Sequence, residues 1–280
     1  MTLLECDLTD YNSVQTTLQE SEPDVIYHLA AQTFVPTSWR APQETMNTNV
    51  MGTLNLLESV RKSKYNPKIL ISSSSEEYGM VHEDEIPIKE TNPLRPLSPY
   101  AVSKVAQDLL GYQYHHSYGL KIIRTRAFNL MGPRSGEKIV TASFAKRVAE
   151  IEKEEARFKA KFKHSETIYK IKVGNLDTIR DFNDVRDIVK AYDLAIKKCD
   201  IGEVYNISIG KGHSIREIIE EYKKLTDAII ITEEDKNLMR PSDVPILIGD
   251  STKFRKKTRW KPEYSWEKSL SDILTYWREK

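Results

Sequence analysis

The sequence lacks the features that mark several common classes of protein. Its two cysteines, Cys6 and Cys199, are far apart and in no metal-ligand spacing, which argues against a disulfide framework or a metal site. The 42 lysine and arginine residues are balanced by 41 aspartate and glutamate residues, so no net charge favours nucleic acid or an anionic membrane. No apolar run approaches a membrane span, and residues 1–7 do not resemble a signal peptide. We therefore expect a cytoplasmic protein without metal, nucleic-acid or membrane partners.

Glycine is also scarce, and the sequence lacks the glycine-rich turn that is typical of dinucleotide-binding folds. No G-x-G-x-x-G or G-x-x-G-x-x-G occurs anywhere among the 280 residues. A dinucleotide-binding fold normally begins with a strand, such a turn and a helix. The chain opens instead at residues 3–7, which we interpret as a later strand, so about 50 upstream residues are expected to be missing. The alternative is that a cofactor is bound in another way.

What the chain does contain is a regular alternation of apolar runs and helical patterns. This alternation predicts a Rossmann-like α/β fold, a parallel sheet with crossover helices that is truncated at its N-terminus. Residues 149–163 are dense in lysine and glutamate, which is typical of a solvated helix or an insertion. Strands are expected at residues 24–29, 68–71, 121–124 and 203–209, and helices at residues 45–63, 99–118, 183–198 and 214–225.

We predict two domains, because the regular alternation of strands and helices ends after Asn129. Residues 1–130 with 183–209 would form a partial dinucleotide-binding domain. Residues 131–182 with 210–280 would form a smaller α/β domain that holds a substrate.

Chemically active side chains follow the apolar run at residues 68–71. Residues 72–78 read Ser-Ser-Ser-Ser-Glu-Glu-Tyr, and ligands of open parallel sheets bind beyond the carboxyl ends of the strands. The next predicted helix has Ser98 as its N-cap, Pro99 at its first position and Gly119 at its end. Tyr100 and Lys104 are one turn apart on this helix and share a face.

An apolar stripe is expected to pack the opposite face of the same helix against the sheet. It contains Val102, Val105, Ala106 and Leu109.

These side chains suit the reversible oxidation of a carbinol to a ketone. A phenol titrates near ~10, so Tyr100 needs the neighbouring Lys104 ammonium to favour its phenolate. The Ser74 hydroxyl can bond the same substrate oxygen and fix its position. The hydride itself requires a nicotinamide.

The spacing of Tyr100 and Lys104 alone is weak evidence. Tyr264 and Lys268, and Tyr276 and Lys280, have the same spacing, and a solvated helix face is the alternative interpretation. The preceding strand, the serine run and the capped helix favour the first pair.

Several ordered segments resemble the extended short-chain dehydrogenase/reductase family, and within it the GDP-sugar branch. The likeness covers nearly the whole chain. The segments are residues 28–32 (HLAAQ), 47–53 (NTNVMGT), 72–79, 100–104, 128–134, 173–182 and 240–245.

The resemblance implies a role for each of a set of residues. Ser74, Tyr100 and Lys104 would form the hydride-transfer triad, and Glu76 matches the acid/base carboxylate of the dehydratases in this branch. The cofactor, NADP or NAD, would be bound by Asp7, Leu8, Ala30, Ala31, Gln32, Asn49, Tyr100 and Lys104. The GDP-sugar substrate would be held by Asn129, Asn175, Arg180, Arg240 and Asp243.

Some of these residues have simpler interpretations. Asp7 or Asp10 can be no more than the cap of the helix that follows, whereas Asn49, between apolar neighbours, favours a buried hydrogen-bonding role. Arg180 beside Asp181 can be a surface ion pair, although a planar guanidinium suits a pyrophosphate. Glu77 is expected to be an exposed bystander.

Three functions remain open at this point. The segment details favour a GDP-4-keto-6-deoxymannose reductase, which delivers hydride to C4 with Tyr100 as the acid. A GDP-mannose 4,6-dehydratase, which would need Glu76, is the alternative, and an inactive truncated homologue or assembly partner is the third. The resemblance also implies a homodimer or homotetramer that pairs through helices of the sheet domain.

Overall fold

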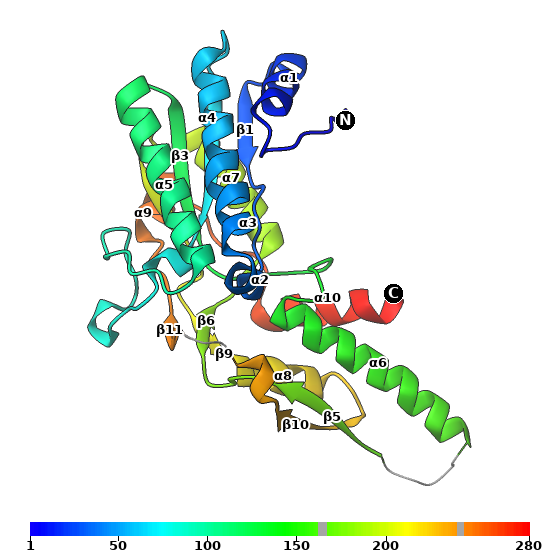
Figure 1. Cartoon of the computed structure of the whole chain (residues 1–280). Coiled ribbons are helices and arrows are strands. Elements are labelled where there is room, and N and C mark those ends of the chain that lie inside the picture. The colour runs from blue at the N-terminus through cyan, green and yellow to red at the C-terminus, as the bar shows by residue number, and fades with distance from the viewer. Residues whose placement is uncertain (162–166, 240–243) are drawn as a thin grey trace.

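A four-stranded parallel sheet forms the upper part of the molecule in Figure 1. The computed structural model describes residues 1–161, 167–239 and 244–280. The strand order is β1-β2-β3-β8, and Ile69 of β2 pairs with Ile122 of β3. The predicted α/β class with a parallel sheet is confirmed. The strands are β1 (Val25–His28), β2 (Lys68–Ser74), β3 (Lys121–Ala127) and β8 (Val204–Ile207).

Helices cover both faces of this sheet, because side chains alternate between the two faces along each strand. Ile69 and Ile71 lie in one apolar core with helices α1, α4 and α5, whereas Leu70 lies in another with α7 and α9. The helices on the first face are α1 (Tyr11–Ser21), α4 (Gly52–Lys62) and α5 (Pro99–Tyr118). Those on the second are α7 (Val185–Lys198) and α9 (Thr252–Thr258).

Short helical segments connect these elements. The helix expected at residues 45–63 is present but divided, because a π-helical turn lies between two α-helical parts. The short segments are α2 (Val35–Arg40), α3 (Pro42–Met46), the π-helix η1 (Asn47–Met51), and the 3₁₀ turns η2 (Ser75–Tyr78), η3 (Glu83–Glu85) and η4 (Lys236–Leu238).

A second, smaller unit packs three helices against a pair of parallel strands (Figure 1). Its core includes Phe144, Ile171, Ile219, Tyr222 and Leu270. Residues 149–161 of the expected solvated helix form the last part of α6, which is largely exposed after the buried Ile151, and residues 162–163 lie outside the described residues. The elements are α6 (Val140–Lys161), β5 (Ile168–Val173), α8 (Ile215–Lys224), β10 (Ile229–Glu234) and α10 (Trp266–Glu279). The exact domain boundaries stay a prediction.

Two small sheets lie where the chain passes between these units. One has the order β11-β6-β9, and the other pairs β4 with β7. The strands are β4 (Leu130–Met131), β6 (Ile179–Asp181), β7 (Asn183–Asp184), β9 (Gly212–Ser214) and β11 (Ile246–Leu247).

The expected strand at residues 3–7 is not formed. These residues are irregular and largely exposed, and β1 is the edge strand of the described sheet. An extended segment becomes a strand only when a neighbouring strand satisfies its backbone groups. Among the described residues, none pairs with this segment.

The expected packing face of α5 was also wrong. Val102 and Leu109 are 42% and 51% exposed, whereas Tyr100, Lys104 and Asp108 are buried towards the sheet. The polar face can be buried because each of its charged or polar groups finds a partner from another element. In the described ranges, no helix is long and apolar enough to cross a membrane.

Candidate active site

Ser74, Tyr100 and Lys104 lie together at the carboxyl end of β2. Ser74 is the last residue of this strand, and its hydroxyl bonds the phenol of Tyr100, the second residue of α5. Lys104, one turn further along α5, donates from Nζ to the Ser72 carbonyl oxygen at 2.6 Å. The hydroxyl, the phenol and the ammonium are thus supplied by adjacent elements and held in one place.

The start of α5 is fixed by local sequence. Ser98 Oγ accepts a hydrogen bond from the Ala101 N–H at 3.0 Å, and Pro99 occupies the first helical position. At the other end Gly119 adopts the left-handed conformation with φ 73°. The predicted caps are confirmed. Because Ser98 fixes the start of α5, it also fixes the position of Tyr100 in the first turn.

Tyr100 is in an environment that keeps its phenol protonated. The side chain is 8% exposed, and burial raises the pKa of Tyr100 above its ordinary value. The hydrogen bond from Ser74 opposes this rise, whereas the nearby charges of Glu76 and Glu77 add to it. The pKa of Tyr100 is thus raised overall, whereas the neighbouring Lys104 alone was expected to lower it. A neutral phenol is suited to act as an acid at neutral pH.

Lys104 belongs to a buried polar network behind the site. Its Nζ donates to Gln107 Oε1 at 2.5 Å, and Gln107 Nε2 donates to Thr53 Oγ1 at 2.8 Å. Since Thr53 donates its own proton to the Asn49 carbonyl oxygen, it must accept from His28 Nε2 at 2.9 Å. Burial lowers the pKa of Lys104, although neighbouring carboxylates oppose this. The network therefore holds an ammonium away from bulk water.

Asn49 joins α5 to the loop after β1. Its Oδ1 accepts from the Gln32 N–H at 2.7 Å, and its Nδ2 donates to the Gln32 carbonyl and to Ser103 Oγ. The predicted buried hydrogen-bonding role is confirmed, and the π-helical turn aims the side chain inward. Ala30 is exposed and Ala31 half-buried beside this anchored loop.

Leu8 is held against α4, and Asp7 beside it is held to the start of α1, where its N–H donates to Ser13 Oγ at 2.9 Å. The Asp7 carboxylate accepts from the Thr9 N–H and hydroxyl, both at 2.8 Å, which lowers the pKa of Asp7. The Leu8 carbonyl accepts from Asn55 Nδ2 at 2.8 Å. It is Asp10, rather than Asp7, that caps α1.

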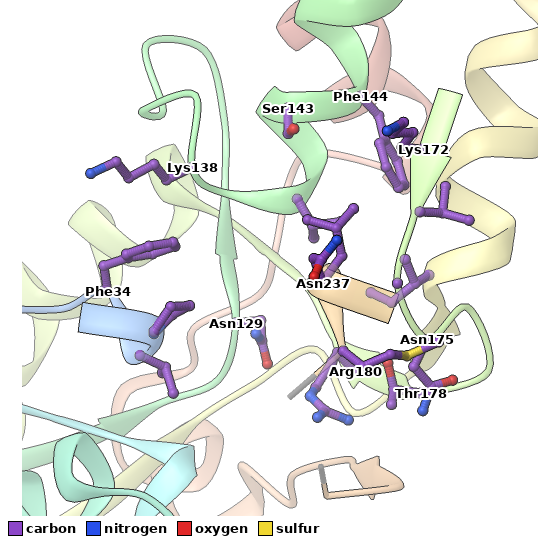
Figure 2. A pocket seen from close by; sticks show the side chains of 18 of the residues that line it. Phe34, Asn129, Lys138, Ser143, Phe144, Lys172, Asn175, Thr178, Arg180 and Asn237 are labelled. Carbon is purple, nitrogen blue, oxygen red and sulfur yellow. The ribbon is translucent and has the colours of Figure 1, made fainter. Parts of the chain in front are cut away.

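A cavity of about 520 Å³ lies between the two units, and Figure 2 shows the side chains around it. Asn129, Asn175 and Arg180, three of the residues predicted to bind the substrate, line this cavity. Arg240 and Asp243 lie outside the described residues. Sequence reasoning missed most of the other lining residues because no motif marks them, among them Phe34, Lys138, Lys172 and Asn237.

Arg180 is buried rather than at the surface. It is 5% exposed, and Nη1 donates to the Ile179 carbonyl oxygen at 2.9 Å. The adjacent Asp181 turns the other way and accepts from the N–H groups of Ile209 at 3.1 Å and Gly210 at 2.8 Å. Asp181 thus ties β6 to the loop after β8 and fixes the strand that carries Arg180.

The two adjacent carboxylates after Ser74 have different surroundings. Glu76 is half-buried, and its charge contributes to raising the pKa of Tyr100. Glu77 is fully buried, so its expected exposure was wrong. No cluster of His, Cys, Asp or Glu in the described ranges could hold a metal ion.

Comparison with known families decides the relationship. The family model described as GDP-mannose 4,6 dehydratase matches residues 1–273. The chain belongs to this family.

Relatives in the GDP-mannose 4,6 dehydratase family include both activities considered above. GDP-6-deoxy-D-mannose reductase from Pseudomonas aeruginosa is 33% identical over 92% of this chain and 81% of the relative. GDP-mannose 4,6-dehydratase from Yersinia enterocolitica is 31% identical over 96% of this chain and 76% of the relative.

Solved structures agree with this family assignment. RMD from Pseudomonas aeruginosa complexed with NADPH has a TM-score of 0.85 and 33% identity, covering 98% of this chain and 88% of that one. UDP-glucose 4-epimerase from Thermotoga maritima, with UDP-glucose, has a TM-score of 0.81 and 29% identity, covering 98% and 83%.

Proposed function

We propose that the chain reduces C4 of GDP-4-keto-6-deoxymannose with NADPH or NADH. The observation that carries this proposal is the buried, neutral phenol of Tyr100, hydrogen-bonded to Ser74. Reduction of a ketone requires an acid beside the carbonyl oxygen, whereas oxidation of an alcohol requires a base. The buried, protonated phenol of Tyr100 can supply that proton.

The chain's own residues divide the work as follows. Tyr100 donates its proton to the oxygen at C4 while Ser74 holds that oxygen in position. Lys104, fixed by Ser72 and Gln107, supplies a positive charge that stabilises the phenolate left after transfer. The nicotinamide, when bound, supplies the hydride.

Residues present in the structure fit the nicotinamide end of such a cofactor. The loop containing Ala30, Ala31 and Gln32 is accessible, and Asn49 ties its backbone to Ser103, the residue before Lys104 on α5. These residues would hold the cofactor near Tyr100, with Asp7 and Leu8 placed for its other end.

The cavity supports a nucleotide sugar as the substrate. A volume of about 520 Å³ is in the range of small-molecule sites, and Arg180 offers a planar guanidinium suited to a pyrophosphate. The buried Asn129 Oδ1 finds no hydrogen-bond donor among the described residues. A ligand hydroxyl or amide would satisfy this acceptor.

The test uses the 280-residue chain with each substrate in turn. With GDP-4-keto-6-deoxymannose and NADPH, mass spectrometry should find a product heavier by two hydrogens. Loss of water from GDP-mannose in the presence of NADP⁺ would contradict the reductase. If neither reaction occurs, calorimetric titration with GDP and with NADPH decides whether the chain is an inactive homologue with a surviving substrate site.

The dehydratase is the second candidate because of Glu76. Its carboxylate lies close enough to Tyr100 to influence the pKa of that phenol, which is where an acid/base group for C5 and C6 would act. Within this proposal Glu76 would perform the elimination that a reductase does not need.

We also propose that two copies pair through α5. Val102, Leu109 and Tyr112 are each more than 40% exposed along this helix, and α4 lies beside it (Figure 1). Exposed apolar side chains in one stripe are typical of a protein interface. Leu109→Glu should convert a dimer into a monomer in sedimentation analysis. An unchanged mass would contradict pairing through this helix.

A further inference from the structure

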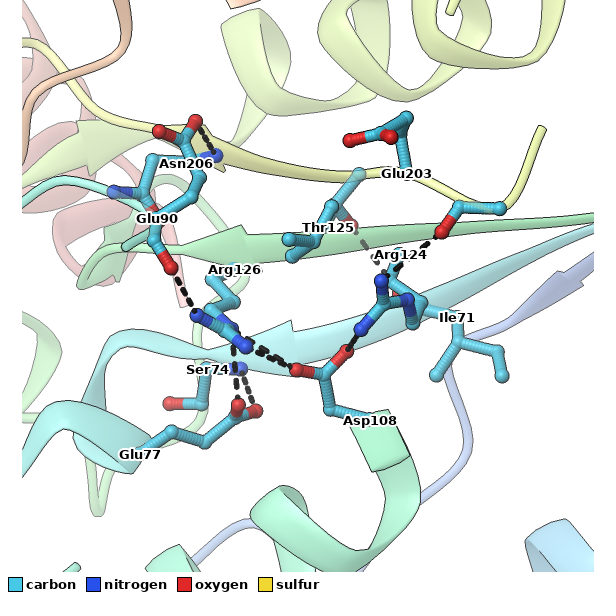
Figure 3. Close-up of polar contacts among 12 residues, drawn as sticks. Ile71, Ser74, Glu77, Glu90, Asp108, Arg124, Thr125, Arg126, Glu203 and Asn206 are labelled. Atoms are coloured by element: carbon cyan, nitrogen blue, oxygen red, sulfur yellow. Dashed lines mark hydrogen bonds and ion pairs between the residues drawn. The ribbon is translucent and has the colours of Figure 1, made fainter. Parts of the chain in front are cut away.

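Glu77 is a buried acid to which the proposed reaction gives no direct role. It is 0% exposed and lies among charged side chains from β3 and α5, as Figure 3 shows. Burying a carboxyl group is costly, and an apolar side chain of similar size at such a place is often at least as stable. The burial therefore calls for an explanation other than stability.

One carboxylate oxygen of Glu77 holds the backbone of Ser74. Oε1 accepts from the Ser74 N–H at 3.0 Å, while Ser74 Oγ accepts from the Glu76 N–H at 3.2 Å. These reciprocal bonds close the 3₁₀ turn η2 directly after β2. The backbone of the residue that bonds Tyr100 is therefore fixed by the Glu77 side chain.

The other oxygen connects this turn to α5. Glu77 Oε2 is 3.2 Å from Arg126 Nε. Nε and Nη2 of that guanidinium donate to Asp108 Oδ2, at 3.0 Å and 2.5 Å, while Nη1 donates to the Tyr78 hydroxyl and the Glu90 carbonyl oxygen. Asp108 is one turn beyond Lys104 on α5, so Arg126 links the two catalytic elements. Burial and the charge of Asp108 raise the pKa of Glu77.

We propose that Glu77 is a positioning residue that keeps the Ser74 hydroxyl aimed at Tyr100. This inference rests on the proposed reductase. The hydrogen bond from Ser74 places Glu77 in control of that residue's backbone, and the Arg126 bridge between Glu77 and Asp108 keeps the turn in register with α5. A displacement of about 1 Å at such a site is enough to lower turnover strongly.

The test compares Glu77→Leu, which removes the bond to Ser74, with Glu77→Gln, which retains an acceptor for it. Glu85 is a matched control because it also closes a 3₁₀ turn, accepting from the His82 N–H at 2.9 Å, and it also pairs with an arginine, Arg95. Glu85→Leu should leave kcat unchanged.

We expect Glu77→Leu to lower kcat about tenfold while KM for the GDP-sugar stays within about threefold, and Glu77→Gln to restore most of kcat. In a Ser74→Ala background, Glu77→Leu should have no further effect on kcat. Additive losses, or a Glu77→Leu enzyme with wild-type kcat, would overturn the proposal.

A second readout does not depend on activity. Hydrogen exchange measured by mass spectrometry should become faster over residues 72–79 in Glu77→Leu, but not in Glu77→Gln or Glu85→Leu. Unchanged exchange would overturn the positioning role even if the wild-type chain has no turnover. Absence of turnover with faster exchange would instead contradict only the proposed reductase.

Discussion

Lys104 donates a hydrogen bond to Gln107, with Nζ and Oε1 2.5 Å apart, and both side chains are buried on one face of α5. Gln107 in turn donates to Thr53, so a single amide orients the ammonium and connects it to α4. Lys104, to which we assign a catalytic role, is therefore held by a side chain that no sequence motif identifies.

Gln107→Leu should destabilise the protein and impair turnover. The substitution removes an acceptor from a buried ammonium and a donor from Thr53, which costs about 2 kcal/mol of unfolding free energy. Urea unfolding measures the loss, and Gln113→Leu, at an exposed position of the same helix, is the control. Equal stability of the two variants would contradict the role given to Gln107.

His28 should make the protein sensitive to acid. Burial lowers the pKa of His28 to about 4, against an ordinary value near ~6.5 in the unfolded chain. The stability associated with the neutral ring is present above pH ~6.5 and is lost as the pH falls towards 4, by up to about 3 kcal/mol. His28→Gln, which keeps a donor to Thr53, should reduce this loss.

Thermal unfolding at pH 7 and pH 4.5 tests the effect of His28. The exposed His116→Gln should retain the wild-type pH dependence. If His28→Gln loses as much stability between these pH values as the wild type does, the buried imidazole is not the cause.

Tyr100→Phe should lower kcat at least about a hundredfold, because the variant lacks the proton donor. GDP affinity, measured by calorimetry, should be unchanged, since Tyr100 does not line the described cavity. Tyr276→Phe, which alters a tyrosine with the same spacing to a lysine, should retain normal turnover. Normal turnover of Tyr100→Phe would remove the triad assignment.

Glu76→Gln should distinguish the two candidate reactions. A reductase needs no acid/base group at C5 and C6, so its kcat should stay within about threefold of wild type. A dehydratase would lose elimination of water from GDP-mannose. The two products are separated by mass spectrometry, and a strong loss of ketone reduction in this variant would contradict the reductase mechanism.

Much of the fold could be predicted because its signals are local. The apolar residues before the serine run form β2, and Ser98, Pro99 and Gly119 delimit α5 as expected. The strand expected at residues 3–7 failed because a strand depends on a neighbouring strand, which a local pattern does not contain.

The face of α5 that packs on the sheet could not be read from periodicity. Hydrophobicity favours burial of Val102 and Leu109, yet the helix buries Lys104, Gln107 and Asp108. These polar groups are tolerated inside only because Ser72, Thr53 and Arg126, distant in sequence, satisfy them. The same reason explains why Glu77 was mistaken for an exposed residue.

The sequence by itself determined the α/β class, the alternation of the main strands and helices of the larger sheet, and the set of residues able to carry redox chemistry. Only the tertiary structure decided that Ser74 meets Tyr100, that burial raises the pKa of Tyr100, and that Glu77 lies inside. Hydrophobic periodicity and capping act between near neighbours in the chain. Burial, hydrogen-bond satisfaction and pKa shifts depend on elements that meet only after folding.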